Sequence, residues 1–195
     1  MASAIIILSA LFIYALFWSW YVGFGRRISK QEIEQTMQLL KGSEFSETKR
    51  AQLLRFLEND DGKDFIMVNL LTLKEPRKES RVLLNRYSKV FLGRLLKRAG
   101  HPIAMARAAS GYLEALNVDE KNTWKMCFMV RYRSRSDFAQ MAIDTFGSDH
   151  HSDKLAALEK TFAFPAATWF VTGGPRWIVA LILALLAALL HIILV

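Results

Sequence analysis

The stretch Phe65-Ile66-Met67-Val68-Asn69-Leu70-Leu71 decides the fold of the central part of this chain. Every residue in it except Asn69 is apolar, and Pro76 follows shortly after it. An unbroken apolar run of this length is typical of a β-strand that is covered on both faces. We therefore expect a strand over 64–73, in which the buried amide of Asn69 needs hydrogen-bond partners.

Helical and extended patterns follow this strand along the chain. Apolar side chains at helical spacing predict a helix over 80–99, which Gly100 is placed to end. Further elements are expected, in chain order, as strands over 102–113 and 124–132, helices after Ser134 and over 151–161, and a strand over 164–172. The order β-α-β-β-α-(α)-β corresponds to the split βαβ, ferredoxin-like arrangement. The predicted fold class is therefore α+β, with a four-stranded antiparallel sheet that carries helices on one face.

The second face of such a sheet has no helix over it, and an apolar sheet face in water is a liability. We therefore expect this face to pair with the sheet of a second copy of the chain or of another protein. The side chains expected there are several of Met67, Asn69, Leu71, Cys127 and Met129, or the residues that alternate with them along the strands. Cys127 is the only cysteine, and its apolar neighbours favour a small buried hydrophobe over a catalytic thiol.

Two short helices are expected ahead of the first strand, one from Ser29 to Gly42 and one over 47–58. The first begins with Ser29-Lys30-Gln31-Glu32, which has the pattern of a capping box. We interpret 26–62 as a helical connector to the membrane and 63–172 as the sheet domain.

The two ends of the chain are uncharged. No Asp, Glu, Lys or Arg occurs in the first 25 or the last 19 residues, although the formal net charge is +8. The segments 4–24 and 177–195 have the length of about 20 apolar residues that crosses a bilayer as a helix. The first lacks the basic start and cleavage site of a signal peptide, so we interpret it as an uncleaved anchor. The sequence thus predicts an integral membrane protein with two spans and one polar domain between them.

Charged and aromatic residues beside the spans predict the orientation. Lys and Arg next to a span mark the cytoplasmic side, where they also meet anionic lipid, and aromatic residues prefer the headgroup depth. The residues expected at this interface are Trp18, Trp20, Tyr21, Arg26, Arg27, Arg176 and Trp177. We therefore expect the central domain in the cytoplasm and both termini on the exterior or periplasmic side of a bacterial inner membrane.

The second span carries Ala180, Ala184 and Ala188 at a spacing of four residues. Small side chains at this spacing allow another helix to pack closely, although Leu and Ala as simple lipid-facing filler explain the pattern equally well. Membrane lipid and other membrane protein subunits are therefore the expected partners of the spans.

Several motifs share their order and spacing with one known family. They are the strand quoted above, Tyr87, Val130-Arg131-Tyr132-Arg133-Ser134-Arg135-Ser136-Asp137-Phe138, the pair His150-His151, and Ala156-Ala157-Leu158-Glu159-Lys160-Thr161. Over about 64–172 the chain resembles the DUF1330-like family of dimeric α/β-barrel domains. It departs from the usual family pattern at Arg133, where proline is common, and at Asp144-Thr145-Phe146-Gly147, where Asp-Pro-x-Tyr is common.

The resemblance implies a dimeric ferredoxin-like domain, in a family without a settled activity. Related dimeric barrels include small monooxygenases, isomerases, dechlorinating and haem-handling enzymes, and ligand-binding modules. The cleft between sheet and helices in such domains often holds a small molecule. Neither membrane span belongs to the usual family pattern.

The candidate ligand-binding side chains are Asn69, Tyr87, Arg131, His150 and His151. Each also has a plainer interpretation: a structural hydrogen bond for Asn69, a core position for Tyr87, a strand end near lipid headgroups for Arg131, and a polar helix cap for the two histidines. Adjacent residues on a helix point about 100° apart, and no H-x-x-x-H spacing is present, so no metal site or other cofactor is expected. The basic residues form no platform interleaved with aromatic residues, which argues against nucleic acid as a partner.

Two functions fit these observations. The first is an accessory or scaffolding subunit of a membrane assembly, because the catalytic inventory is thin and the domain is expected to pair. The alternative is a membrane-tethered enzyme or binder that acts on a small apolar or aromatic, quinone-like molecule. The sequence therefore does not decide whether the protein is an enzyme, and its small number of candidate catalytic residues argues against it.

Overall fold

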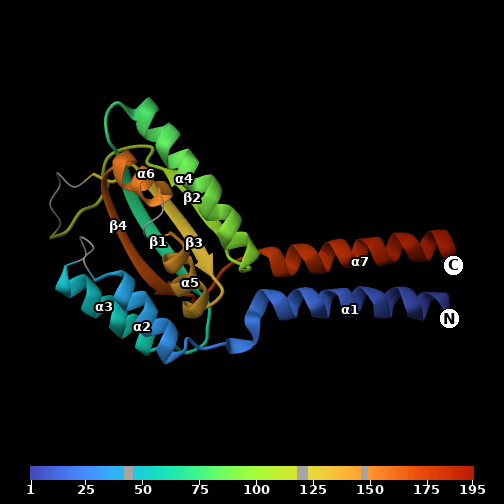
Figure 1. Cartoon of the computed structure of the whole chain (residues 1–195). Coiled ribbons are helices and arrows are strands. Elements are labelled where there is room, and N and C mark those ends of the chain that lie inside the picture. Colours follow the sequence, from blue (N-terminus) through green and yellow to red (C-terminus); the bar gives the residue numbers. More distant parts are fainter. Residues whose placement is uncertain (42–45, 118–122, 146–148) are drawn as a thin grey trace. The chain divides into compact units, whose positions relative to one another are not determined.

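The computed structural model describes residues 1–41, 46–117, 123–145 and 149–195. Contacts divide the chain into two compact units, one formed by Met1–Phe24 together with Thr168–Val195 and the other by Gly25–Ala167. The first unit contains the two terminal helices, and the second contains the sheet (Figure 1).

Four strands form one antiparallel sheet in the unit Gly25–Ala167. They are β1 (Phe65–Leu73), β2 (His101–Arg107), β3 (Met126–Tyr132) and β4 (Leu158–Ala167), in the spatial order β2-β3-β1-β4. The helices between them are α4 (Arg77–Lys97), α5 (Arg135–Thr145) and α6 (Asp149–Ala157). This is the ferredoxin-like, split βαβ order, so the predicted α+β fold class is confirmed.

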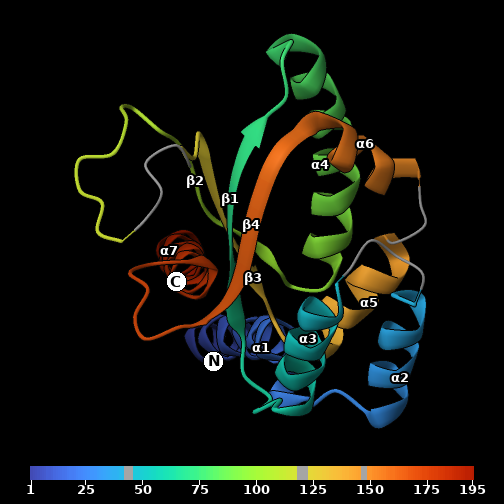
Figure 2. The ribbon, with the colours of Figure 1, turned by 90° about the vertical axis from the view of Figure 1, so that its left-hand side faces the viewer.

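The helices α4, α5 and α6 lie on one side of the sheet (Figure 2). We call the covered side the helix face and the opposite side the open face. Because side chains alternate along a strand, β1 directs Phe65, Met67, Asn69 and Leu71 to the helix face, where Phe65 and Leu71 belong to buried core clusters. The described helices of this unit leave the open face uncovered.

The prediction for the open face was wrong in part. Met67, Asn69 and Leu71 lie on the helix face, whereas Cys127 and Met129 lie on the open face and pair with Leu70 and Val68. The register decides this, because odd-numbered residues of β1 oppose even-numbered residues of β3. The apolar side chains that the register places on the open face are Ile66, Val68, Leu70, Cys127, Met129, Phe162 and Phe164.

The last strand differs most from its prediction, which was a helix over 151–161 followed by a strand over 164–172. The helix α6 ends at Ala157, and β4 begins at the next residue. Leu155 and Leu158 fit a helical spacing in the sequence, but they are too few to decide between the two periods. Pairing with the whole length of β1 satisfies the backbone groups of β4 and makes the extended form the better one.

The strand β2 ends at Arg107, although the pattern predicted 102–113. Its partner β3 begins at Met126, directly opposite Arg107, so the ladder stops there. The predicted strand 124–132 begins two residues later, at Met126, so Trp124 precedes β3. Its ring lies 6.2 Å from the ring of Phe162, which the register places on the open face.

The helix α4 ends at Lys97, two residues earlier than predicted. The residue in the left-handed conformation after it is Ala99, with a φ of 56°, and not Gly100. Gly100 donates its amide hydrogen to the Leu95 carbonyl at 3.0 Å. A Cβ atom at Gly100 would lie 2.4 Å from Leu95 Cδ1 and 2.8 Å from the Arg131 carbonyl oxygen, so space and not φ requires glycine here.

Two further helices, α2 (Lys30–Leu39) and α3 (Glu47–Glu58), precede β1. The capping box of α2 is present: Ser29 N donates to Glu32 Oε2 at 2.8 Å, and Glu32 N donates to Ser29 Oγ at 3.2 Å. The same carboxylate accepts a hydrogen bond from Ser136 Oγ of α5 at 2.6 Å. The helix α2 is therefore fastened to the sheet domain, and both helices fall within the same compact unit.

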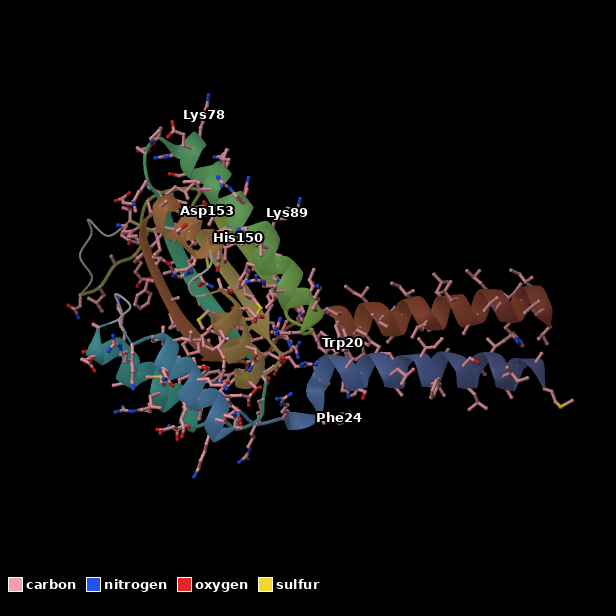
Figure 3. The ribbon with its side chains drawn as sticks, viewed as in Figure 1. Trp20, Phe24, Lys78, Lys89, His150 and Asp153 are labelled. Carbon is pink, nitrogen blue, oxygen red and sulfur yellow. The ribbon has the colours of Figure 1, made fainter. Side chains whose placement is uncertain are left out.

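The other unit consists of α1 (Ala2–Val22) and α7 (Pro175–Leu194), both long and apolar enough to span a membrane. Apolar side chains project outward along both helices (Figure 3). Most of the less exposed residues of α1 recur three or four positions apart, as packing against α7 requires: Ser3, Ile6, Ala10, Tyr14, Phe17 and Tyr21, with Ser19 and Val22 also partly covered near its end. Gly173 and Gly174, with φ of 75° and 103°, form the turn into α7 that only glycine adopts readily.

Candidate functional site

A cavity of about 290 Å³ lies between the helix face of the sheet and the helices α4, α5 and α6. Its lining is mostly apolar and comes from every strand and from all three helices. The lining residues are Met67, Asn69, Leu71, Phe128, Val130 and Tyr132 from the central strands, Pro102, Met105, Thr161 and Ala163 from the outer strands, Leu84, Tyr87, Ser88, Phe91 and Leu92 from α4, Phe138, Met141, Ala142 and Thr145 from α5, and His151 and Lys154 from α6.

The cavity lies between two separate core clusters. One is built around Phe65, Val130 and Met141, and the other around Leu71 and Leu158. Members of both clusters also line the cavity. A domain usually has one contiguous core, so this sheet and its helices enclose space that their own side chains do not fill.

The local structure explains how each wall is positioned. Alternation along β1 places Met67, Asn69 and Leu71 side by side on the floor of the cavity. On α6, His151 and Lys154 are three residues apart, so they share one face of the helix. Thr161 of β4 is exposed, so the cavity opens beside this outer strand.

Asn69 has a fixed orientation in the cavity floor. Its Nδ2 donates to the carbonyl oxygens of Met67 at 3.1 Å and of Phe128 at 3.3 Å. Within the described part of the chain, its Oδ1 accepts no hydrogen bond. The structural role expected for Asn69 and the ligand-binding role are therefore compatible, because one end of the amide holds the strands and the other end is an acceptor in the cavity.

Tyr87 and Tyr132 provide hydroxyl groups to the cavity. Burial raises the pKa of Tyr87 to about 12. Burial also raises the pKa of Tyr132, and the neighbouring Tyr87 raises it further. Both phenols therefore stay protonated at neutral pH, and they act as hydrogen-bond donors and not as bases.

The two basic side chains of α6 are poorly solvated. Burial lowers the pKa of His151, and the nearby Lys154 lowers it further, so the imidazole is neutral at pH 7. Burial also lowers the pKa of Lys154. The Lys154 ammonium nitrogen lies 5.5 Å from the centroid of the Tyr87 ring, which is within cation–π range.

Arg131 and His150 are not brought to the cavity with the other candidates. Arg131 is buried, and its guanidinium donates from Nε to Asp64 Oδ2 at 2.7 Å and from Nη1 to the Ala99 carbonyl at 2.8 Å. His150 has a buried Nδ1 without a hydrogen-bond partner among the described residues. Figure 3 shows His150 and Asp153 on α6, where Asp153 forms an ion pair with Arg86 at 3.3 Å.

No group of three or more His, Cys, Asp or Glu side chains that could hold a metal ion occurs in the described ranges. The Asp149-His150-His151-Ser152-Asp153 stretch, the most polar of the chain, is thus divided between different surroundings. His151 lines the cavity, Asp153 pairs with α4, and His150 lies apart from both.

The residues expected near the membrane interface fall in both units. In the helical unit, Arg176 Cζ lies 5.4 Å from the ring centroids of both Trp18 and Tyr21, while Trp20 and Trp177 are exposed. In the sheet unit, Arg26 pairs with Glu32 at 3.2 Å, and Arg27 is exposed.

The three alanines of α7 that the sequence singled out differ in their exposure. Ala180 is partly covered, whereas Ala184 and Ala188 are exposed. Val179, Leu183 and Ala187 are also partly covered. Ala184 and Ala188 therefore face away from the contact between α1 and α7.

Sequence reasoning missed Lys154 as a site residue. A signal was available in the helical spacing, because Lys154 shares a face with His151. Tyr132 and Met105 were also missed. Their place in the cavity depends on strand pairing, which no local pattern shows.

No family model and no curated protein matches this chain. Two crystal structures of the RPA0582 protein, a protein of unknown function from Rhodopseudomonas palustris, are similar in fold. One is 20% identical, with a TM-score of 0.49, and the match covers 66% of this chain and 97% of that chain. The other, of the methylated protein, is 18% identical, with a TM-score of 0.49, and the match covers 67% and 96%.

Proposed function

We propose that this chain is a membrane-anchored protein whose α+β domain binds a small, largely apolar molecule in the cavity between the sheet and α4, α5 and α6. The observation that carries the proposal is the cavity itself. Its volume of about 290 Å³ is at the lower end of the range for small-molecule sites, about 300–1,000 Å³. Such sites combine an apolar lining with a few polar groups, and Asn69, Tyr87 and His151 are polar groups of this kind.

The energetics of the cavity support an occupant. The cavity opens beside β4 and its lining is mostly apolar, so its apolar side chains lack packing partners on one side. An apolar occupant would supply these contacts and remove the lining from water, which gains about 25 cal/mol per Å² of apolar area.

The two apolar helices would hold the binding domain at a membrane surface. A ligand that partitions into lipid is concentrated at the membrane, so a tethered domain meets it there. The basic residues Arg26, Arg27 and Arg176 support a cytoplasmic position for the domain, with both termini on the exterior side. The DUF1330-like resemblance over 64–172 supports the same use of the cleft.

The test is recovery of the ligand from the full chain. The protein is extracted into nanodiscs of its native lipid, and small molecules released by denaturation are identified by mass spectrometry. Ala163→Phe fills the cavity from β4, and Ala166→Phe is the matched control on the open face of the same strand. We expect a molecule that is enriched with the wild type and the control and absent with Ala163→Phe. Identical profiles for all three proteins and for empty nanodiscs would contradict the proposal.

The second proposed function is an accessory or scaffolding subunit that pairs through the open face. The observation that favours it is the exposure of Phe162 and Phe164, at 53% and 41%, beside Val68 and Met129 on the same face. Burying these side chains against a second copy of the sheet would gain about 25 cal/mol per Å² of apolar area.

The only cysteine reports on this pairing, because Cys127 lies on the open face. We expect slow alkylation of Cys127 by a maleimide in the assembled wild type and fast alkylation after Met129→Glu, which places a charge in the interface. Lys121, the control position suggested by the sequence, lies outside the described residues. Lys89→Glu replaces it, because Lys89 points away from the sheet on α4 (Figure 3). Equal alkylation rates in all three proteins would exclude pairing through this face.

A further inference from the structure

Lys154 is a basic side chain in the wall of the cavity, and no described carboxylate pairs with it. Its ammonium group forms no ion pair with any carboxylate whose side chain the structure describes, and it lies over the face of the Tyr87 ring, 5.5 Å from the centroid. The adjacent acid, Asp153, is held by Arg86 at 3.3 Å. No Asp or Glu occurs among the described residues that line the cavity.

This arrangement is unfavourable without a ligand. A poorly solvated charge costs free energy unless it is paired, and burial accordingly lowers the pKa of Lys154. A cation–π contact repays only about 0.5–2 kcal/mol. The neighbouring His151 does not compensate the charge, because it is itself a base.

We infer that the cavity takes a small hydrophobic acid, whose acidic oxygen pairs with Lys154 and whose apolar body lies against Met67, Phe91 and Phe128. This inference rests on the proposed ligand-binding function and narrows the chemical class of the ligand. A carboxylate, or an acidic phenol or enol, matches the ammonium group, and the protonated hydroxyl of Tyr87 supplies a second donor in the same wall.

The lining also argues against the other charge types. A cationic ligand would meet the positive charge of Lys154 and no carboxylate in the described lining. A neutral apolar ligand would fill the volume but leave the ammonium group as poorly solvated as before. An acid both fills the volume and forms a charge-assisted hydrogen bond, which is roughly twice as strong as a neutral one.

The experiment compares two probes with the same apolar body, 2-naphthoic acid and 2-naphthamide. Their affinities for the full chain in phosphatidylcholine nanodiscs are measured at pH 7.5 by equilibrium dialysis, with correction for empty discs. We expect the wild type to bind the acid at least tenfold more tightly than the amide. Lys154→Met should remove this preference and change the affinity for the amide by less than twofold.

Two variants complete the design. Lys154→Arg keeps the charge and should keep a preference for the acid, so it separates loss of charge from loss of folding. Lys160→Met removes a lysine of the open face, which lies 5.3 Å from the Trp124 ring, and should change neither affinity. Circular dichroism of each variant checks that the fold is retained.

The outcomes separate the inference from the proposed function. Equal binding of both probes by the wild type, or a preference for the acid that survives Lys154→Met, overturns the inference and leaves the cavity as a site for neutral apolar ligands. Absence of binding for both probes, together with no effect of Ala163→Phe on extracted molecules, overturns the proposed function and the inference with it.

Discussion

Ser136 at the start of α5 donates a hydrogen bond of 2.6 Å to Glu32, the capping carboxylate of α2. The Glu32 side chain thus caps α2 and also contacts α5, because the same carboxylate accepts the Ser29 backbone amide hydrogen at 2.8 Å. The two helices begin more than a hundred residues apart in the sequence. The Glu32 carboxylate therefore couples the local start of α2 to the packing of the sheet domain.

Glu32→Gln tests this coupling. Burial opposes ionisation of Glu32, but hydrogen bonds from Ser136 and Ser29 and the charge of Arg26 outweigh it, so the pKa of Glu32 lies below its usual 4.5. A lowered folded-state pKa stabilises the protein above pH 4.5, and this contribution is lost as pH falls through the folded-state pKa. We expect Glu32→Gln to cost about 1–3 kcal/mol at pH 7, measured by thermal unfolding of the full chain, and progressively less as the pH falls below 4.5.

The control for this variant lies on the same helix. Glu34 is exposed, so Glu34→Gln should change the unfolding temperature little at either pH. A pH-independent effect of Glu32→Gln would show that the charge of the carboxylate is not what stabilises α2.

Gly100 and Gly93 form a matched pair for substitution by alanine. A Cβ atom at Gly100 meets the buried Leu95 side chain and the Arg131 carbonyl, so Gly100→Ala should destabilise the protein by about 1–3 kcal/mol. Nothing lies within 4 Å of a Cβ atom at Gly93, inside α4, so Gly93→Ala should stabilise it by about 0.5–1 kcal/mol. Opposite shifts of the unfolding temperature check the prediction, and shifts of the same sign would refute it.

Arg131→Met removes a buried ion pair and one hydrogen bond at once. The side chain of Arg131 on β3 donates hydrogen bonds to Asp64, the residue before β1, and to the carbonyl of Ala99, which follows α4 in the sequence. We expect a loss of about 1–3 kcal/mol in unfolding free energy, because Asp64 and the Ala99 carbonyl each lose a hydrogen bond from a charged donor. Binding of 2-naphthoic acid by the folded fraction should be unchanged, since Arg131 lies outside the cavity lining.

The orientation in the membrane is tested by reporter fusions. A reporter after Val195 should read as exterior, because the basic residues lie beside the inner ends of both spans. A reporter inserted between Lys121 and Asn122, which lie outside the described residues, should read as cytoplasmic. The reverse pattern would overturn the charge argument.

The strand β1 shows how far the sequence alone was informative. Its predicted range, 64–73, differs from the observed Phe65–Leu73 by one residue. A long apolar run bounded by a turn and Pro76 is compatible only with a buried strand, so the prediction was accurate. The strand β4 was placed about six residues too late, because Leu155 and Leu158 fit both periods. The faces of the sheet could not be assigned, since a shift of one residue in register exchanges them.

The sequence predicted which residues belong to the candidate site better than it predicted how they are arranged. Asn69, Tyr87 and His151 were candidate ligand-binding residues, and the structure brings all three to one cavity. Arg131 was also a candidate, but Asp64 and the Ala99 carbonyl engage its guanidinium. No local pattern distinguishes a paired arginine from a free one.

The sequence by itself determined the features that depend on neighbouring residues. The two apolar ends, the capping box at Ser29 and the central strand follow from composition and spacing over a few turns, and their free energy is decided locally. The tertiary structure alone decided what lies together: Lys154 with Tyr87, Arg131 with Asp64, and Cys127 on the open face. Those relationships depend on strand register and helix packing, which are set by the competition of the whole chain for buried area and hydrogen-bond partners.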